Sequence, residues 1–94
     1  MGKRYGVRFD LWVSGRLDPQ LVVMDKEEQP TREEIAACIK EKSEALQGKL
    51  FGSESDQAEV EIEYRSGVVS DQELLGRDPG FGVLCQEIKP TAGE

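Results

Sequence analysis

The sequence predicts an α+β domain in which one amphipathic helix packs on one face of a four-stranded, mainly antiparallel β-sheet. Three observations support this fold class. Residues 3–13 and 58–65 alternate polar and apolar side chains, which is the pattern of half-buried strands. Residues 31–50 instead carry apolar residues at helical spacing behind a capping box. The predicted order is strand, strand, helix, strand, short helix, strand.

The first two strands are expected to form a β-hairpin. One face of residues 3–13 is apolar and carries Tyr5, Val7, Phe9, Leu11 and Val13. The opposite face carries Arg4, Gly6, Arg8, Asp10 and Trp12. Turn-forming residues occupy positions 14–19, so we expect a loop of moderate length there. The short apolar run 21–24 then forms the second strand, and residues 25–29 form a polar connection.

The main helix is expected to begin after Thr31. This residue precedes Glu34 by three positions, which is the spacing of a capping box. Gly48 is the expected end of the helix. The apolar stripe that should dock on the sheet consists of Ile35, Cys38, Ile39, Leu46 and Leu50. This stripe predicts that Leu46 lies in the core.

The next predicted strand, residues 58–65, is strongly acidic. Val60, Ile62 and Tyr64 point into the core, while the residues between them point to the opposite face. These outward residues are Glu59, Glu61 and Glu63, at a spacing of about 7 Å. Ser66 and Gly67 are expected to end the strand. The sequence therefore predicts a row of carboxylates on a solvated sheet face.

The remaining residues complete a single domain that spans residues 1–94. Ser70 and Glu73 form a second, weaker capping box, which predicts a single helical turn. The segment 77–80 is a strong turn signal, and residues 81–88 form the last expected strand. Residues 91–94 are expected to form a short flexible tail.

The charge of the chain limits its partners. Lys and Arg number 12 and Asp and Glu number 19, which gives a net charge of -7. Such a protein is repelled by nucleic acid and by anionic membranes, so direct binding to either is disfavoured and a basic protein partner is favoured. No apolar run approaches the length of a membrane span. We expect a cytoplasmic protein.

The residues typical of catalysis are missing from this sequence. The chain has no histidine and only two cysteines, Cys38 and Cys85, which lack a C-x-x-C partner. No phosphate-binding loop or nucleophile-elbow motif occurs. The sequence therefore predicts no catalytic residues, no metal site and no cofactor. Both cysteines are expected to be reduced core thiols, with a disulfide between them as the alternative.

The face opposite the helix is the candidate protein-binding surface. Its acidic row would steer a basic partner, and Trp12 would anchor the contact because Trp is enriched at interface hot spots. Arg4, Arg8 and Asp10 share the face of Trp12. Two arrangements of the arginines remain open. They pair with Glu61 and Glu63 if the two strands are neighbours, or they leave self-complementary stripes that favour a two-fold homodimer.

The sequence thus favours a small, acidic, non-enzymatic interaction module that binds a basic, nucleic-acid-handling protein through its acidic sheet face. An inhibitor encoded by a phage or mobile element would have this profile. The alternative is an oligomeric α+β domain that binds a small ligand, or acts as an enzyme, at a site between subunits. For the glutamates alone, the simpler alternative is a solvated face that keeps the sheet soluble.

Overall fold

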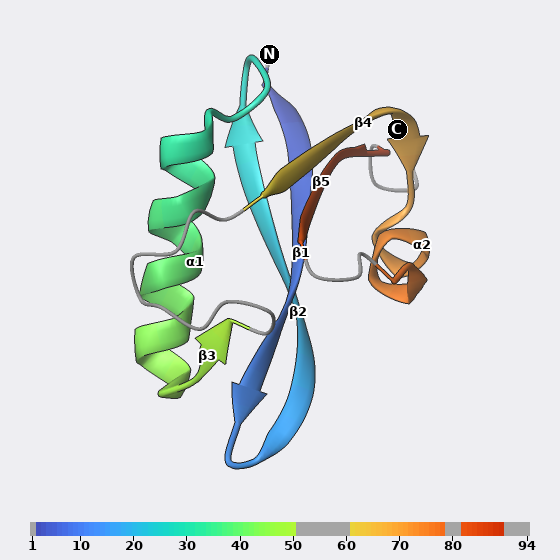
Figure 1. Cartoon of the computed structure of the whole chain (residues 1–94). Helices are drawn as coiled ribbons and strands as arrows, with labels where there is room; N and C mark the ends of the chain where they lie inside the picture. The colour runs from blue at the N-terminus through green and yellow to red at the C-terminus, as the bar shows by residue number, and fades with distance from the viewer. Residues whose placement is uncertain (1, 51–60, 79–81, 90–94) are drawn as a thin grey trace.

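The computed structural model describes residues 2–50, 61–78 and 82–89. It confirms the α+β class, with helix α1 on one side of a β-sheet and helix α2 on the other (Figure 1). In chain order the elements are β1 (Lys3–Val13), β2 (Arg16–Lys26), α1 (Arg32–Leu46), β3 (Lys49–Leu50), β4 (Ile62–Val69), α2 (Asp71–Gly76) and β5 (Val83–Ile88). The predicted tail, residues 91–94, lies outside the described residues.

Within the described residues the sheet has five strands in place of the four predicted, and it is mainly antiparallel, as predicted, with one parallel pair. Its order is β2-β1-β5-β4, and β3 pairs with the end of β1. Strand β1 is antiparallel to β2, β3 and β5, whereas β4 and β5 are parallel. Parallel neighbours need a crossover connection, which the segment containing α2 supplies. The sequence could not indicate this crossover, because a short helix between two strands can connect either antiparallel or parallel neighbours.

The β1–β2 hairpin is tighter than predicted. Val13 pairs directly with Arg16, so only Ser14 and Gly15 form the turn. Their φ angles are 52° and 79°, and positive values at both positions are characteristic of a type I′ hairpin turn. Strand β2 therefore includes Pro19, which the prediction placed in a loop. Proline is tolerated here because β2 lies at the edge of the sheet.

The main core lies between α1 and the sheet. Phe9, Val7 and Leu11 of β1 are fully buried there. The other buried members of this core cluster are Tyr5, Ile35, Ile39, Ile62, Val83 and Cys85. The stripe on α1 is thus confirmed in its first half. Val60, another predicted core residue, lies outside the described residues.

Leu46 is a correction to the predicted stripe, because 36% of its surface is exposed. The helix stops at Gln47, whose φ of 55° is left-handed, and the Gly48 amide then donates to the Ser43 carbonyl at 2.9 Å. This cap turns the chain back toward β1. Leu50 of β3, and not Leu46, then packs against the core cluster.

The N-terminus of α1 carries the predicted capping box and an ion pair to the sheet. Thr31 Oγ1 accepts from the Glu34 amide at 3.2 Å, and Glu34 Oε1 accepts from the Thr31 amide at 2.9 Å. Lys26 Nζ on β2 donates to Glu34 Oε2 at 2.7 Å. This hydrogen bond from Lys26, together with the capping bond, lowers the pKa of Glu34 below its usual 4.5.

This lowered pKa predicts an acid-dependent contribution of Glu34 to stability. A carboxylate whose pKa falls on folding stabilises the fold fully above its unfolded pKa. That contribution is lost as the pH falls through the lower folded pKa. Glu34→Gln should therefore lower the melting temperature at pH 7, and the difference from wild type should shrink from about pH 4.5 downward. Thermal unfolding between about pH 7 and pH 3 measures this difference. Glu33→Gln, in the same turn, is the matched control, and a Glu34→Gln difference that stays constant with pH contradicts the expectation.

A second cluster lies on the opposite face of the sheet, which the sequence predicted to be solvated. Helix α2 begins at the predicted capping box, where Ser70 Oγ accepts from the Glu73 amide at 3.1 Å. Leu74 of α2 is fully buried against the sheet over Gly6. The cluster consists of Val69, Leu74, Leu84 and Ile88. The face opposite α1 is therefore partly covered.

Strand β4 contains a bulge and contributes a residue to each cluster. The sequence predicted that Ser66 and Gly67 end this strand, and this was wrong. They interrupt the pairing of β4 with β5 between Arg65 and Val68, and the strand continues to Val69. Gly67 has a φ of 99°, which suits glycine. Because the bulge adds two residues to β4, the alternation of faces continues across it, and Ile62 packs in the α1 cluster while Val69, seven positions later, packs in the α2 cluster.

Candidate protein-binding surface

The predicted site residues of β1 lie on the sheet face that α2 partly covers. Gly6 faces Leu74, and by strand alternation Arg4, Arg8, Asp10 and Trp12 share the side of Gly6. We call this side the α2 face. Its half beyond α2, toward the hairpin turn, carries Asp10 and Trp12.

Of the three predicted acidic residues, two are described by the structure. Glu63 of β4 pairs in register with Leu84, which belongs to the α2 cluster, so Glu63 lies on the α2 face. Glu61 immediately precedes β4 and is exposed. Glu59 lies outside the described residues. The carboxylate row is therefore seen here as Glu61 and Glu63.

The arginines of β1 are not cross-strand neighbours of these glutamates. Strand β5 lies between β1 and β4, so the two strands are not neighbours. Glu63 Oε1 instead accepts from Arg65 Nη2 at 3.1 Å on its own strand. This bond neutralises part of the acidic row.

Arg8 is a buried charge and not a surface residue. Only 8% of it is exposed, and its Nη2 lies 3.7 Å from Asp10 Oδ1. Its Nε and Nη1 atoms are buried and have no hydrogen-bond partner within the described residues. Asp10 therefore acts mainly as the counter-ion of Arg8. Arg4, by contrast, is half-buried.

Trp12 is exposed, and the structure adds a residue that the sequence did not single out. Trp12 pairs in register with Leu17 of β2, and their exposed fractions are 43% and 45%. Because Val13 and Arg16 close the two-residue turn, Trp12 and Leu17 form a non-hydrogen-bonded pair, in which side chains lie closest. The pair lies next to the hairpin turn, where Trp12 also pairs in register with Lys49 of β3. Figure 1 shows β3 beside this end of the hairpin. Leu17 was missed because Pro19 placed it in a predicted loop.

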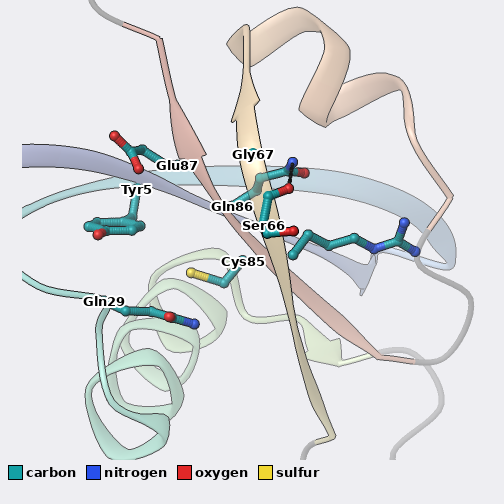
Figure 2. Close-up of a pocket in the computed structure, with 8 residues that line it drawn as sticks. Tyr5, Gln29, Ser66, Gly67, Cys85, Gln86 and Glu87 are labelled. Carbon is teal, nitrogen blue, oxygen red and sulfur yellow. Dashed lines mark hydrogen bonds between the residues drawn. The ribbon is translucent and has the colours of Figure 1, made fainter.

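A polar pocket lies beside the β4 bulge and is lined by residues of β1, β4 and β5 (Figure 2). Its volume is about 150 Å³, and its lining includes Tyr5, Ser66, Cys85 and Gln86. Gln86 Nε2 donates to the Ser66 carbonyl at 3.2 Å. Ligand pockets usually occupy about 300–1,000 Å³. This pocket therefore suits a few water molecules better than a substrate.

The chemistry of the pocket is also unreactive. Both cysteines are free thiols, and Cys85 lies in the core cluster while Cys38 is half-buried. Burial raises the pKa of Cys85 to about 11, so this thiol is protonated and weakly nucleophilic at neutral pH.

The described ranges contain no group of three or more His, Cys, Asp or Glu side chains arranged to hold a metal ion. Neither helix α1 nor α2 is long and apolar enough to cross a membrane.

Comparison of the chain with protein-family models, with curated proteins and with solved structures found no match.

Proposed function

We propose that this protein is a non-enzymatic interaction module that binds a basic protein through the hairpin end of its α2 face. The observation that carries the proposal is the exposed pair of Trp12 and Leu17. Tryptophan buries a large apolar area on binding and is enriched at interface hot spots. A neighbouring exposed leucine extends this apolar contact. We call the two residues the hairpin anchor.

The net charge of the chain, -7, favours a basic partner. The charges beside the hairpin anchor are mixed, because exposed Arg16 and Asp18 flank Leu17 and exposed Lys49 pairs with Trp12. Glu61 and Glu63 are exposed at the opposite edge of the sheet. Such charges act over a Debye length of about 8–10 Å and speed the encounter with a positive surface. A nucleic-acid-handling protein offers such a surface, and an inhibitor encoded by a phage or mobile element would exploit it.

The two alternatives have less support. A ligand-binding or enzymatic domain needs a site, and the pocket beside β4 is small and contains a protonated thiol. A face that serves only solubility explains the glutamates but not an exposed tryptophan next to an exposed leucine. The hairpin anchor therefore supports protein binding over these two alternatives.

The test is a comparison of variants in affinity capture. The tagged protein is used to capture proteins from a lysate, in parallel with Trp12→Ala and with Val68→Ala, which truncates an exposed apolar residue of β4. We expect a protein that wild type and Val68→Ala retain, that Trp12→Ala loses, and that high salt releases. Capture of the same proteins by wild type and by Trp12→Ala, with both chains folded, contradicts the proposal.

Kinetics with the purified partner separate anchoring from steering. Trp12→Ala should speed dissociation and weaken binding by about 2 kcal/mol or more. Reversal of Glu61 and Glu63 to lysine should instead slow association, and the wild-type association rate should fall with salt. If the reversal leaves the association rate unchanged, the partner is not guided by this acidic surface.

A further inference from the structure

The outer edge of β2 is a second candidate interaction surface, separate from the hairpin anchor. Strand β2 spans 11 residues and lies at the end of the sheet order. No strand in the described part of the chain pairs with its outer side. A long open edge presents unpaired backbone groups that another strand can bind.

The hairpin turn determines which backbone groups point outward. In an antiparallel ladder, hydrogen-bonded and non-hydrogen-bonded pairs alternate, and the pair that closes a two-residue turn is hydrogen-bonded. Val13 and Arg16 form this closing pair. The backbone groups of alternate β2 residues therefore point away from β1. These residues are Leu17, Pro19, Leu21, Val23 and Asp25.

Pro19 hinders strand pairing along only part of this edge. It has no N–H, so at its position an incoming strand receives no donor, which is a common protection of edge strands. Leu21, Val23 and Asp25 keep both groups, and the exposed Val23 side chain stands among them. The second half of β2 thus remains open to pairing.

We propose that two copies of this chain associate through antiparallel pairing of their β2 strands, with the two-fold axis at Val22. In this register Leu21 and Val23 of one copy exchange backbone hydrogen bonds with Val23 and Leu21 of the other. The backbone N–H of Asp25 donates to the Pro19 carbonyl of the second copy, whereas Pro19 has no N–H to return, so each of the two symmetry-related Asp25–Pro19 pairs lacks one hydrogen bond. The two sheets join into one continuous sheet.

The charges along β2 select this register over its neighbours. With the axis at Val22, Asp18 lies opposite Lys26 of the second copy, and beyond the strand end Arg16 lies opposite Glu28. An axis at Leu21 would place Arg16 opposite Lys26, and an axis at Val23 would place Asp18 opposite Glu28. Both of these registers oppose like charges, which is unfavourable between neighbouring strands. A two-fold axis midway between two residues is excluded. It would pair residues whose backbone groups point outward with residues whose backbone groups point toward β1, so no ladder of hydrogen bonds could form.

The existing contacts of Lys26 are compatible with this pairing. Lys26 Nζ donates to Glu34 at 2.7 Å, and 35% of its side chain is exposed. An ammonium group has three donors, so a second carboxylate can be bound beside Glu34. Asp18 is exposed, and its Oδ2 accepts from Gln20 Nε2 at 3.0 Å.

Cysteine cross-linking tests the register directly. With the axis at Val22, the two Val22 Cα atoms lie about 4.5 Å apart, within the range of a disulfide, whereas the two Val23 Cα atoms lie more than about 7 Å apart. Under mild oxidation, Val22→Cys should form a covalent dimer, while Val23→Cys and wild type, which has two native cysteines, should not. Faster cross-linking of Val23→Cys than of Val22→Cys overturns the proposal.

Sedimentation tests the association and its charge pattern without cross-linking. Wild type should show a monomer–dimer equilibrium, and Asp18→Lys should weaken it about tenfold or more, because two symmetry-related pairs become repulsive. Glu63→Lys, the same charge change at the opposite edge of the sheet, should leave it unchanged. Trp12→Ala should also leave it unchanged, which separates this surface from the hairpin anchor. A wild type that stays monomeric throughout, or an Asp18→Lys variant that associates like Glu63→Lys, overturns the proposal.

Discussion

Replacing Phe9 by alanine should lower the free energy of unfolding by about 3–5 kcal/mol. Phe9 is fully buried in the centre of β1, in the cluster between the sheet and α1. Its neighbours on this face, Val7 and Leu11, are held by pairing with β2, so the cavity cannot collapse without moving the central strand. Urea denaturation of wild type and variant measures the loss.

Two residues of α1 provide the matched comparison for this core. Ile35 is fully buried, and Ile35→Ala should cost about 2–5 kcal/mol. Leu46 lies on the same predicted stripe but is 36% exposed, so Leu46→Ala should cost about 1 kcal/mol or less. Equal losses at the two positions would mean that α1 docks along its whole length, as the stripe alone predicted.

The elements that local patterns specify could be predicted from the sequence. The alternation of residues 3–13 predicts β1 to the residue, and both capping boxes occur at the helix N-termini where Thr31 and Ser70 place them. These signals depend on neighbours within a few positions. The signal at Pro19 misled because proline marks a loop as well as an edge strand, and only the sheet order distinguishes the two.

The parallel pairing of β4 and β5 could not be predicted, because it depends on where α2 packs. The apolar residues of α2 are few, and Leu74 becomes a core residue only because Gly6 leaves room for it across the sheet. The same long-range contact explains why the opposite face is partly covered. The bulge at Ser66 and Gly67 was invisible for the same reason, since a strand break and a bulge use the same residues.

For the candidate site, the sequence placed Trp12 on the face opposite the core and missed its companion, Leu17. The alternation of β1 puts Trp12 outside the α1 core, and this placement is confirmed. The same alternation put Arg8 on a solvated face, yet Arg8 is buried beside Asp10. A single strand cannot reveal what covers its second face. The pairing of Leu17 with Trp12 could be predicted only from the hairpin register, which the two-residue turn at Ser14 and Gly15 determines.

The contact between Leu74 and Gly6 should carry a large share of the stability of the second cluster. Leu74 is fully buried, so Leu74→Ala should lower the free energy of unfolding by about 2–5 kcal/mol. Gly6→Ala should lower it by about 1–3 kcal/mol through overpacking. A Cβ at Gly6 would lie 2.2 Å from Leu74 Cδ2 and 2.8 Å from Ile88 Cδ1, and both side chains are buried with little room to move.

The double variant distinguishes a direct contact from two separate effects. Once Leu74 is truncated, most of the space that the new methyl group needs is open, so Gly6→Ala should cost much less in the Leu74→Ala background than in wild type. Residues in contact typically show coupling of about 0.5–3 kcal/mol in such cycles. Urea denaturation of the four proteins measures it. Gly76→Ala is the control for adding a methyl group to a glycine, because no described atom lies within 4 Å of a Cβ built there. Additive losses at Gly6 and Leu74 would show that α2 does not pack on β1 through this contact, and the α2 face would then be as open as the sequence first predicted.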